Sequence, residues 1–108
     1  MATPALFSPT TVGNITLQHR VVLAPLTRMR NSDDHVPIKE LLVPYYAQRA
    51  AVPGTLLIAE GTIISPQASG LPNAPGIWND EQISAWRAVS AWISPTTLIM
   101  LNEALFRS

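Results

Sequence analysis

Two short apolar runs without polar interruption stand out along the chain. They occupy residues 21–24 (Val-Val-Leu-Ala) and residues 55–59 (Thr-Leu-Leu-Ile-Ala). Continuous runs of this length are typical of strands that are buried on both faces of a parallel sheet. Pro25 ends the first run, and Glu60-Gly61 ends the second. We therefore predict two buried strands, each followed by a loop.

A helical pattern follows the first run. Between residues 39 and 51, side chains that share a face recur at spacings of three and four, and Pro53-Gly54 predicts the end of this helix. Pro44 lies inside the pattern, and a proline in a helix interior costs about 3 kcal/mol. We therefore expect the helix to begin at Val43-Pro44, where the missing N–H of proline has no partner to lose.

The second helix is predicted to begin at Asn79 or Asp80, where a side-chain oxygen can cap the first turn and Glu81 favours its positive end. The apolar positions of this helix lie three or four residues apart, at Ile83, Trp86, Val89 and Ile93.

A hairpin is predicted before the first strand, because Gly13-Asn14 lies between short apolar stretches and is typical of a tight turn.

The order strand, helix, strand, helix predicts an α/β fold with a parallel sheet. Residues 97–101 (Thr-Leu-Ile-Met-Leu) are typical of a third strand, whereas Ser94-Pro95 favours a short helix that runs to residue 108. The sequence leaves both alternatives open.

Composition and charge narrow the functional classes. The 108 residues carry seven basic and seven acidic side chains, and this balance argues against a nucleic-acid-binding arm or a polybasic membrane surface. The lack of cysteine excludes disulfides and thiolate chemistry, and two histidines are too few for a metal centre without carboxylate ligands. No stretch reaches the ~18–20 apolar residues of a membrane span and no export signal is visible, so we expect a cytoplasmic protein.

No self-contained catalytic motif, such as a P-loop or a GxSxG elbow, occurs in the sequence. In parallel α/β folds, ligands bind beside the loops that follow the carboxyl ends of the strands. Thr27 lies in the first such loop, and its hydroxyl can donate to a ligand carbonyl or ring nitrogen or, equally, cap a turn. Gly61 lies in the second loop and permits close approach of a flat ligand to the backbone.

Other polar residues favour structural roles. We interpret Glu60 as a partner of a nearby arginine in an ion pair, with a functional role as the alternative. Asp33-Asp34-His35 is interpreted as a solvated loop tip, and His19 as a hydrogen-bonded structural residue. Tyr45-Tyr46, on the first predicted helix, favours core packing over proton donation.

Several short motifs in a fixed order give the sequence a recognisable likeness. From about residue 6 to residue 90, the chain resembles the N-terminal part of the old yellow enzyme family. The motifs that carry this resemblance are Leu6-Phe7-Ser8-Pro9, Gly13, His19-Arg20, Ala24-Pro25-Leu26-Thr27-Arg28-Met29-Arg30, Tyr45-Tyr46-Ala47-Gln48-Arg49-Ala50, Glu60-Gly61-Thr62-Ile63-Ile64-Ser65-Pro66-Gln67-Ala68 and Asn73-Ala74-Pro75-Gly76-Ile77-Trp78.

The resemblance implies a partial (β/α)8 TIM barrel, with the N-terminal hairpin and about two βα units present in this chain. In that family NADPH or NADH reduces a bound FMN, which passes a hydride to the β-carbon of an α,β-unsaturated carbonyl compound. Pro25, Leu26 and Thr27 match the segment that lies along the flavin, and Gly61 matches a backbone contact to it. The family's proton-donating tyrosine and substrate-binding histidine pair have no match here, so no catalytic residue is assigned.

The likeness fades after about Val89. We expect residues 1–108 to form an incomplete N-terminal portion of the barrel domain, with residues 90–108 as a divergent tail. Leu71 stands where many relatives have a tyrosine, which leaves substrate preference open. A full barrel needs roughly 250 residues, so we expect this chain alone to fold poorly, to aggregate, or to be completed by another chain. The alternatives to an ene reductase fragment are a non-catalytic relic, an interaction module, or half of a split barrel.

Overall fold

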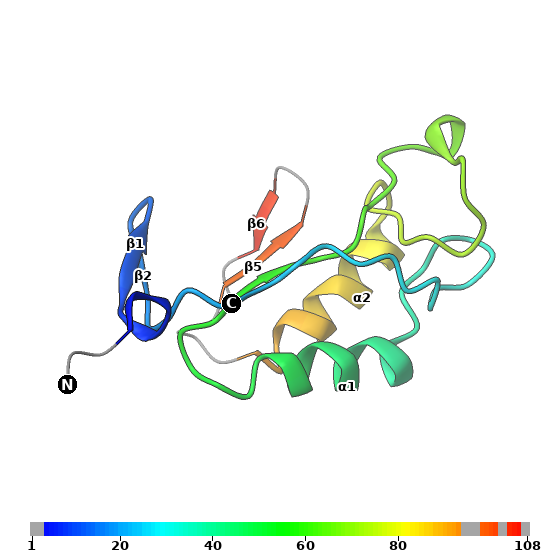
Figure 1. The fold of residues 1–108 in the computed structure, drawn as a ribbon. Helices are drawn as coiled ribbons and strands as arrows, with labels where there is room; N and C mark the ends of the chain where they lie inside the picture. The colour runs from blue at the N-terminus through cyan, green and yellow to red at the C-terminus, as the bar shows by residue number, and fades with distance from the viewer. Residues whose placement is uncertain (1–3, 94–97, 102–103, 107–108) are drawn as a thin grey trace.

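The computed structural model describes residues 4–93, 98–101 and 104–106. Within these residues two α-helices pack on one side of a four-stranded sheet, and a two-stranded hairpin lies towards the N-terminus (Figure 1). The elements in chain order are a 3₁₀ turn (Ala5–Phe7), β1 (Thr10–Val12), β2 (Ile15–Leu17), β3 (Val22–Leu23), α1 (Lys39–Arg49), β4 (Leu56–Ile58), a second 3₁₀ turn (Pro66–Ala68), α2 (Asp80–Ser90), β5 (Leu98–Leu101) and β6 (Ala104–Phe106).

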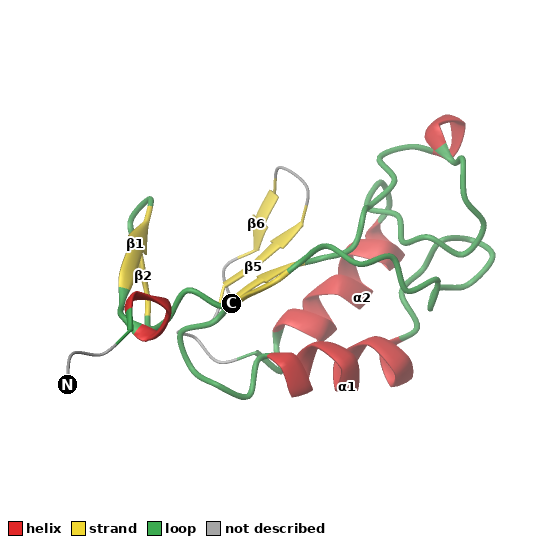
Figure 2. Ribbon diagram, in the orientation of Figure 1, coloured by secondary structure: helices red, strands yellow, loops and turns green. Residues whose placement is uncertain are grey.

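The four-stranded sheet has the order β3-β4-β5-β6. The strands, drawn yellow in Figure 2, include the parallel set β3, β4 and β5. Leu57 of β4 pairs with Leu23 on one side and with Ile99 on the other. This topology confirms the predicted α/β fold, and β5 shows that the strand alternative holds for residues 98–101. Residues 94–97, where the alternative helix would begin, lie outside the described residues. β6 runs antiparallel to β5 and is not predicted from the sequence.

The core lies between the two helices and β4. Trp86 of α2 is fully buried, and its indole Nε1 donates to the Gly76 carbonyl oxygen at 3.2 Å, so its polar atom is satisfied. Truncation of such a side chain to alanine costs about 3–5 kcal/mol. The buried side chains of this core are Leu42, Tyr45, Tyr46, Ala50, Leu57, Ala59, Trp86, Val89 and Ile93.

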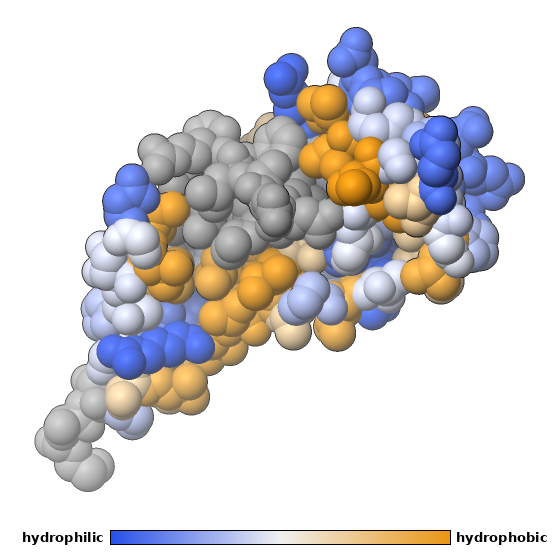
Figure 3. All heavy atoms as spheres, turned by 90° about the horizontal axis from the view of Figure 1, so that it is seen from above, coloured by the Kyte–Doolittle hydropathy of each residue, from blue (hydrophilic) through white to orange (hydrophobic). Residues whose placement is uncertain are grey.

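β3 is less buried than its apolar run predicts. Val21 and Val22 are 48% and 40% exposed, and Leu23 is half-buried. β3 is an edge strand, because β4 is its one neighbour among the described strands. On its other side no described strand covers its side chains. Seen from above in Figure 3, hydrophobic residues gather over part of the surface. The prediction of burial on both faces is therefore wrong for β3, whereas Leu56 and Leu57 of β4 are buried.

α1 begins at Lys39 and contains Pro44 in its interior, so the predicted start at Val43 is wrong. The reason is tertiary: Leu42 is fully buried, and a start at Val43 would leave it outside the helix. Pro44 lies on the exposed face, where water can reach the Glu40 carbonyl that loses its helical partner. Packing of the buried face therefore outweighs the local cost of the proline.

α2 begins with a capping box. The Asn79 side chain accepts from the Gln82 backbone N–H at 2.9 Å, and the Gln82 side chain accepts from the Asn79 N–H at 3.3 Å. Asn79 is thus the cap among the two predicted candidates. Gln82 is fully buried, and it also accepts from the Trp78 N–H at 2.8 Å and donates to the Asp34 carbonyl at 3.2 Å. It therefore ties the start of α2 to the loop that precedes α1.

The hairpin turns at Gly13, whose φ of +61° fits the predicted tight turn. Leu17 of β2 is buried against Leu56 of β4, and the Gln18 N–H donates to the Gly54 carbonyl at 3.1 Å. These contacts hold the hairpin beside the amino-terminal end of β4. Neither α1 nor α2 is long and apolar enough to cross a membrane, and no other described helix is.

Candidate functional site

The loops that follow β3 and β4 leave the sheet at the same end, because the two strands are parallel neighbours (Figure 1). Pro25, Leu26 and Thr27 lie in the first loop, and Gly61 lies in the second. All four residues are exposed. The structure thus places the four predicted cofactor-contacting residues at one end of the sheet, which we call the loop edge.

Thr27 and Gly61 present free surface at the loop edge. The Thr27 hydroxyl makes no hydrogen bond to another residue in the described part of the chain, so no turn cap is seen there. A Cβ added at Gly61 would meet no atom within 4 Å. A planar ring can therefore approach the Gly61 backbone without displacing protein atoms, and Thr27 has a donor to offer it.

Glu60 precedes Gly61 and is only 1% exposed. The Tyr46 hydroxyl donates to Glu60 Oε2 at 2.8 Å, and the Glu60 backbone N–H donates to the Tyr46 Oη at 3.3 Å. Burial raises the pKa of Glu60, and the hydrogen bond from Tyr46 together with the charge of Arg28 opposes this rise. Burial and then the Glu60 charge raise the pKa of Tyr46. Glu60 forms no ion pair at contact distance with a described arginine, although the charge of Arg28 acts on it, and its side-chain hydrogen-bond donor is the neutral Tyr46 phenol.

Two asparagines join the loop after β3 to the loop before α2. Asn31 Nδ2 donates to the Asn73 carbonyl at 2.7 Å, and Asn73 Nδ2 donates to the Asn31 carbonyl at 2.9 Å. Asn31 Oδ1 and Glu60 Oε1 are buried and have no hydrogen-bond partner among the described residues. A protonated Glu60 has a donor that an ionised one lacks, and its raised pKa favours that form.

His35 joins the same two loops. Its Nδ1 donates to the Ala74 carbonyl at 2.7 Å, which leaves Nε2 to accept from the Ser69 hydroxyl at 3.0 Å. The interpretation as a solvated loop tip is therefore wrong for His35, because residues 65–76 fold back against it. Asp33-Asp34 is exposed, as that interpretation requires.

His19 has the structural role predicted for it. The Val21 N–H donates to its Nδ1 at 3.1 Å, so the proton sits on Nε2, which donates to Thr55 Oγ1 at 2.8 Å. The Thr55 hydroxyl donates in turn to the Val52 carbonyl at 2.6 Å. This chain of bonds lies at the amino-terminal ends of β3 and β4, opposite the loop edge. The described residues hold no group of three or more histidine, aspartate or glutamate side chains that could bind a metal ion.

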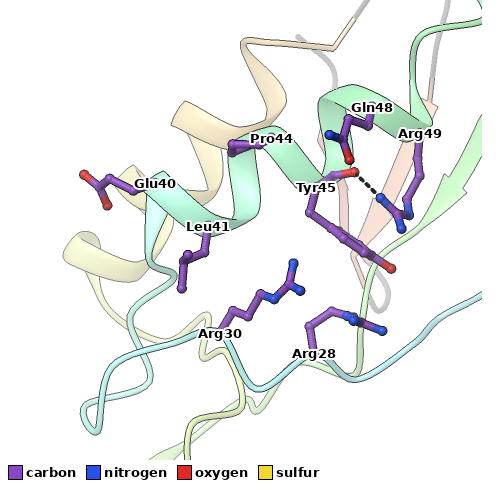
Figure 4. Close-up of a pocket in the computed structure, with 8 residues that line it drawn as sticks. All are labelled: Arg28, Arg30, Glu40, Leu41, Pro44, Tyr45, Gln48 and Arg49. Atoms are coloured by element: carbon purple, nitrogen blue, oxygen red, sulfur yellow. Dashed lines mark hydrogen bonds between the residues drawn. The ribbon is translucent and has the colours of Figure 1, made fainter.

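A pocket of about 410 Å³, which the sequence reasoning missed, lies between α1 and the loop after β3 (Figure 4). Arg28 and Arg30 line it from the loop, and Arg49 lines it from α1. Their guanidinium carbons lie 5.1, 5.5 and 3.8 Å from the ring centroid of Tyr45. The sequence does contain a signal for this pocket. Arg28 and Arg30 are two residues apart on an extended segment, and Tyr45 and Arg49 are four apart on a helix, so the members of each pair share a side.

Comparison with known families adds to this geometry. Residues 5–96 match the model of the NADH:flavin oxidoreductase / NADH oxidase family. The chain belongs to this family. FMN is the family's cofactor, and NADH or NADPH is its reductant. The matched residues include both loops of the loop edge.

Curated members of the flavin oxidoreductase family share high identity with this chain. It is 56% identical over 85 residues to the chanoclavine-I aldehyde reductase fgaOx3 of Penicillium roqueforti, covering 79% of this chain and 23% of that protein. It is 49% identical over 89 residues to a probable inactive reductase easA of Epichloe festucae var. lolii, and 44% identical over 90 residues to enoate reductase 1 of Kluyveromyces lactis. Each of these covers 82% of this chain and 23% of the relative. The chain thus spans about a quarter of the length of these relatives.

Solved structures of old yellow enzymes contain the same arrangement. The enzyme from Pichia sp. AKU4542 has a TM-score of 0.81 and 40% identity, covering 88% of this chain and 25% of that chain. The enzyme from Trypanosoma cruzi has a TM-score of 0.81 and 37% identity, covering 91% of this chain and 26% of that chain. The resemblance inferred from the motifs is confirmed, and the described sheet and helices correspond to part of an α/β barrel.

The loop edge fits the family's cofactor in two respects. Gly61 leaves room for a ring against the backbone, and the Thr27 hydroxyl is unengaged among the described residues. Leu26 adds an apolar side chain that is 48% exposed at this edge.

Proposed function

We propose that the chain supplies the flavin-facing loop edge of an FMN-dependent NAD(P)H oxidoreductase that reduces the C=C bond of α,β-unsaturated carbonyl compounds. The observation that carries the proposal is the placement of Pro25, Leu26, Thr27 and Gly61 at one end of parallel strands β3 and β4. Membership of the NADH:flavin oxidoreductase family supports it, as do relatives named aldehyde reductase and enoate reductase.

Each residue of the loop edge has a distinct part in this proposal. FMN, when bound, supplies the hydride for the β-carbon of the substrate. Pro25 and Leu26 provide an apolar surface for the ring, and the Thr27 hydroxyl donates to a ring carbonyl or nitrogen. Gly61 lets the ring lie close to the backbone, and Glu60 holds the end of β4 to α1 through Tyr46. No described residue is assigned to bind the substrate carbonyl or to protonate the product.

Titration of the full chain with FMN, followed by flavin fluorescence, tests the proposal. We expect a dissociation constant below about 10 μM, which corresponds to about 7 kcal/mol. G61V places a side chain where the ring approaches, and we expect it to weaken FMN binding about tenfold or more. G70V is the matched control, because a Cβ at either glycine meets no protein atom within 4 Å.

A second pair of variants tests the contribution of the Thr27 hydroxyl to FMN binding. T27V keeps the shape of the side chain and removes the donor, so we expect about fivefold weaker binding and a shifted flavin absorption band. T27S restores both. A chain that is folded by circular dichroism yet does not bind FMN contradicts the proposal, as does equal weakening by G61V and G70V.

The second candidate is a non-catalytic product of the same ancestry, either a relic or an interaction module. The observation that favours it is the set of similar relatives named as probable inactive reductases or dehydrogenases, 45–49% identical to this chain. Failure to bind FMN supports this candidate over the first. A split barrel is distinguished from both, because FMN would then bind only after a complementing chain is added.

A further inference from the structure

The pocket between α1 and the loop after β3 concentrates positive charge in a chain with a formal net charge of zero. The guanidinium carbons of Arg28, Arg30 and Arg49 all lie within 5.5 Å of the Tyr45 ring centroid. Three like charges held around one ring repel one another, and the negative ring faces of Tyr45 offset only part of that repulsion. The residues that line the pocket thus carry three positive charges against the one negative charge of Glu40.

No described carboxylate forms an ion pair at contact distance with these arginines, although the charge of Arg28 acts on the buried Glu60 carboxyl. Glu40 is the one carboxylate that lines the pocket, and Figure 4 shows it directed away from the guanidinium groups. Arg49 donates one bond to the Tyr45 carbonyl at 3.1 Å. The remaining side-chain donors of Arg49, and those of Arg28 and Arg30, are not used within the described residues. They are available to an anion from solution.

The shape and chemistry of the pocket select among anions. Its volume of about 410 Å³ lies within the roughly 300–1,000 Å³ typical of small-molecule sites. The planar fork of arginine matches the oxygens of phosphate and carboxylate groups. A phosphate monoester carries about −1.5 to −2 charges at pH 7, so it compensates three cations better than a single carboxylate does. Leu41 and Pro44 add an apolar strip along α1 for an organic group.

We propose that this pocket is a binding site for a small phosphate monoester. Arg28, Arg30 and Arg49 hold the phosphate, and the organic part of the ligand lies over Leu41 and Pro44. The site is separate from the loop edge, since neither Thr27 nor Gly61 lines it, and it does not require the proposed flavin function.

Isothermal titration calorimetry of phenyl phosphate into the full chain, at constant ionic strength and without flavin, tests this proposal. We expect saturable binding with one site per chain. R30Q and R49Q each weaken it about tenfold, since each removes one charge-assisted contact while keeping a side chain of similar length. R87Q is the matched control, because it removes the same charge from an exposed position on α2 outside the pocket.

A second measurement does not depend on any variant. In the unsubstituted chain, phenyl phosphate shifts the Nε–Hε NMR signals of Arg28, Arg30 and Arg49 and leaves that of Arg87 in place. Absence of saturable binding overturns the proposal, and so does equal weakening by R87Q and R30Q. Tenfold tighter binding of a hexaglutamate peptide than of phenyl phosphate also overturns it, because the pocket would then be a docking site for an acidic protein segment.

Discussion

Glu60 accepts a buried hydrogen bond from the Tyr46 hydroxyl, and the protonation of the Glu60 carboxyl is linked to folding. Burial raises the pKa of Glu60 above its ordinary value of 4.5, which applies in the unfolded chain. As the pH rises past that value, the unfolded chain releases the proton while the folded chain keeps it. The folded state then binds more protons, so stability falls with rising pH until the pH passes the folded-state pKa.

We predict that the free energy of unfolding, measured with urea between pH 4 and 8, falls as the pH rises and that E60Q removes this fall. Glutamine has no carboxyl proton to exchange and keeps the shape of the side chain. E40Q is the control, because Glu40 is an exposed carboxyl on α1. Y46F leaves Glu60 Oε2 unpaired, which costs about 1–3 kcal/mol, and it widens the pH range of the fall. A wild-type stability that rises over this range contradicts the prediction.

The sequence predicts where a residue lies relative to its own strand or helix, but it does not predict which distant residue its side chain contacts. The positions of Thr27 and Gly61 at the loop edge are predicted from the sequence, because each residue follows a recognisable strand. The partners of Glu60 and His35 are not, because those bonds join residues 14 and 39 positions apart and depend on how α1 and the loop before α2 return to the sheet. The same holds for the pocket arginines, which come from two separate elements.

The two helices differ in what decides where they begin. Asn79 and Gln82 lie within one turn, so the start of α2 is a local matter and the sequence predicts it. The start of α1 depends on the burial of Leu42 against the rest of the core, which outweighs the local penalty of Pro44. Local signals therefore predict an element's boundary only where tertiary packing does not compete with them.

For the start of α2, we predict that N79A lowers the free energy of unfolding by about 1 kcal/mol, which is the usual cost of losing an N-cap. N79D is the control, since aspartate keeps the acceptor and adds a favourable charge at the helix start. Urea unfolding followed by circular dichroism measures both. Equal losses for N79A and N79D would show that the amide of Asn79, not its cap, matters.

At the scale of the whole molecule, the described residues expose apolar side chains along the edge strand β3. Val21, Val22 and Leu26 are between 40% and 48% exposed along β3 and the loop after it. An exposed apolar edge strand is a template for association with another chain. The α/β topology and the tendency of an incomplete barrel to associate are both predicted from the sequence. Which strand is exposed is not predicted, because an apolar run looks the same whether or not its neighbours are present.

We predict that the full chain self-associates and that V22K shifts it towards a monomer, because a charge on an edge strand opposes strand pairing. V52K is the matched control, since Val52 is 59% exposed but lies in the turn between α1 and β4. Sedimentation velocity measures the shift. A compact monomer of 11.7 kDa that unfolds cooperatively without substitution contradicts the prediction.

β6 has a consequence for any chain that would complete the barrel. It pairs antiparallel with β5, with Phe106 opposite Ile99, whereas barrels of this type consist of eight parallel strands. β6 therefore occupies the place of the next parallel strand. As a tethered segment, it has an effective concentration in about the millimolar range, roughly a thousandfold above that of a partner at micromolar concentration. A complementing chain must outcompete β6 at that edge, so the sheet accepts new strands more readily beside β3.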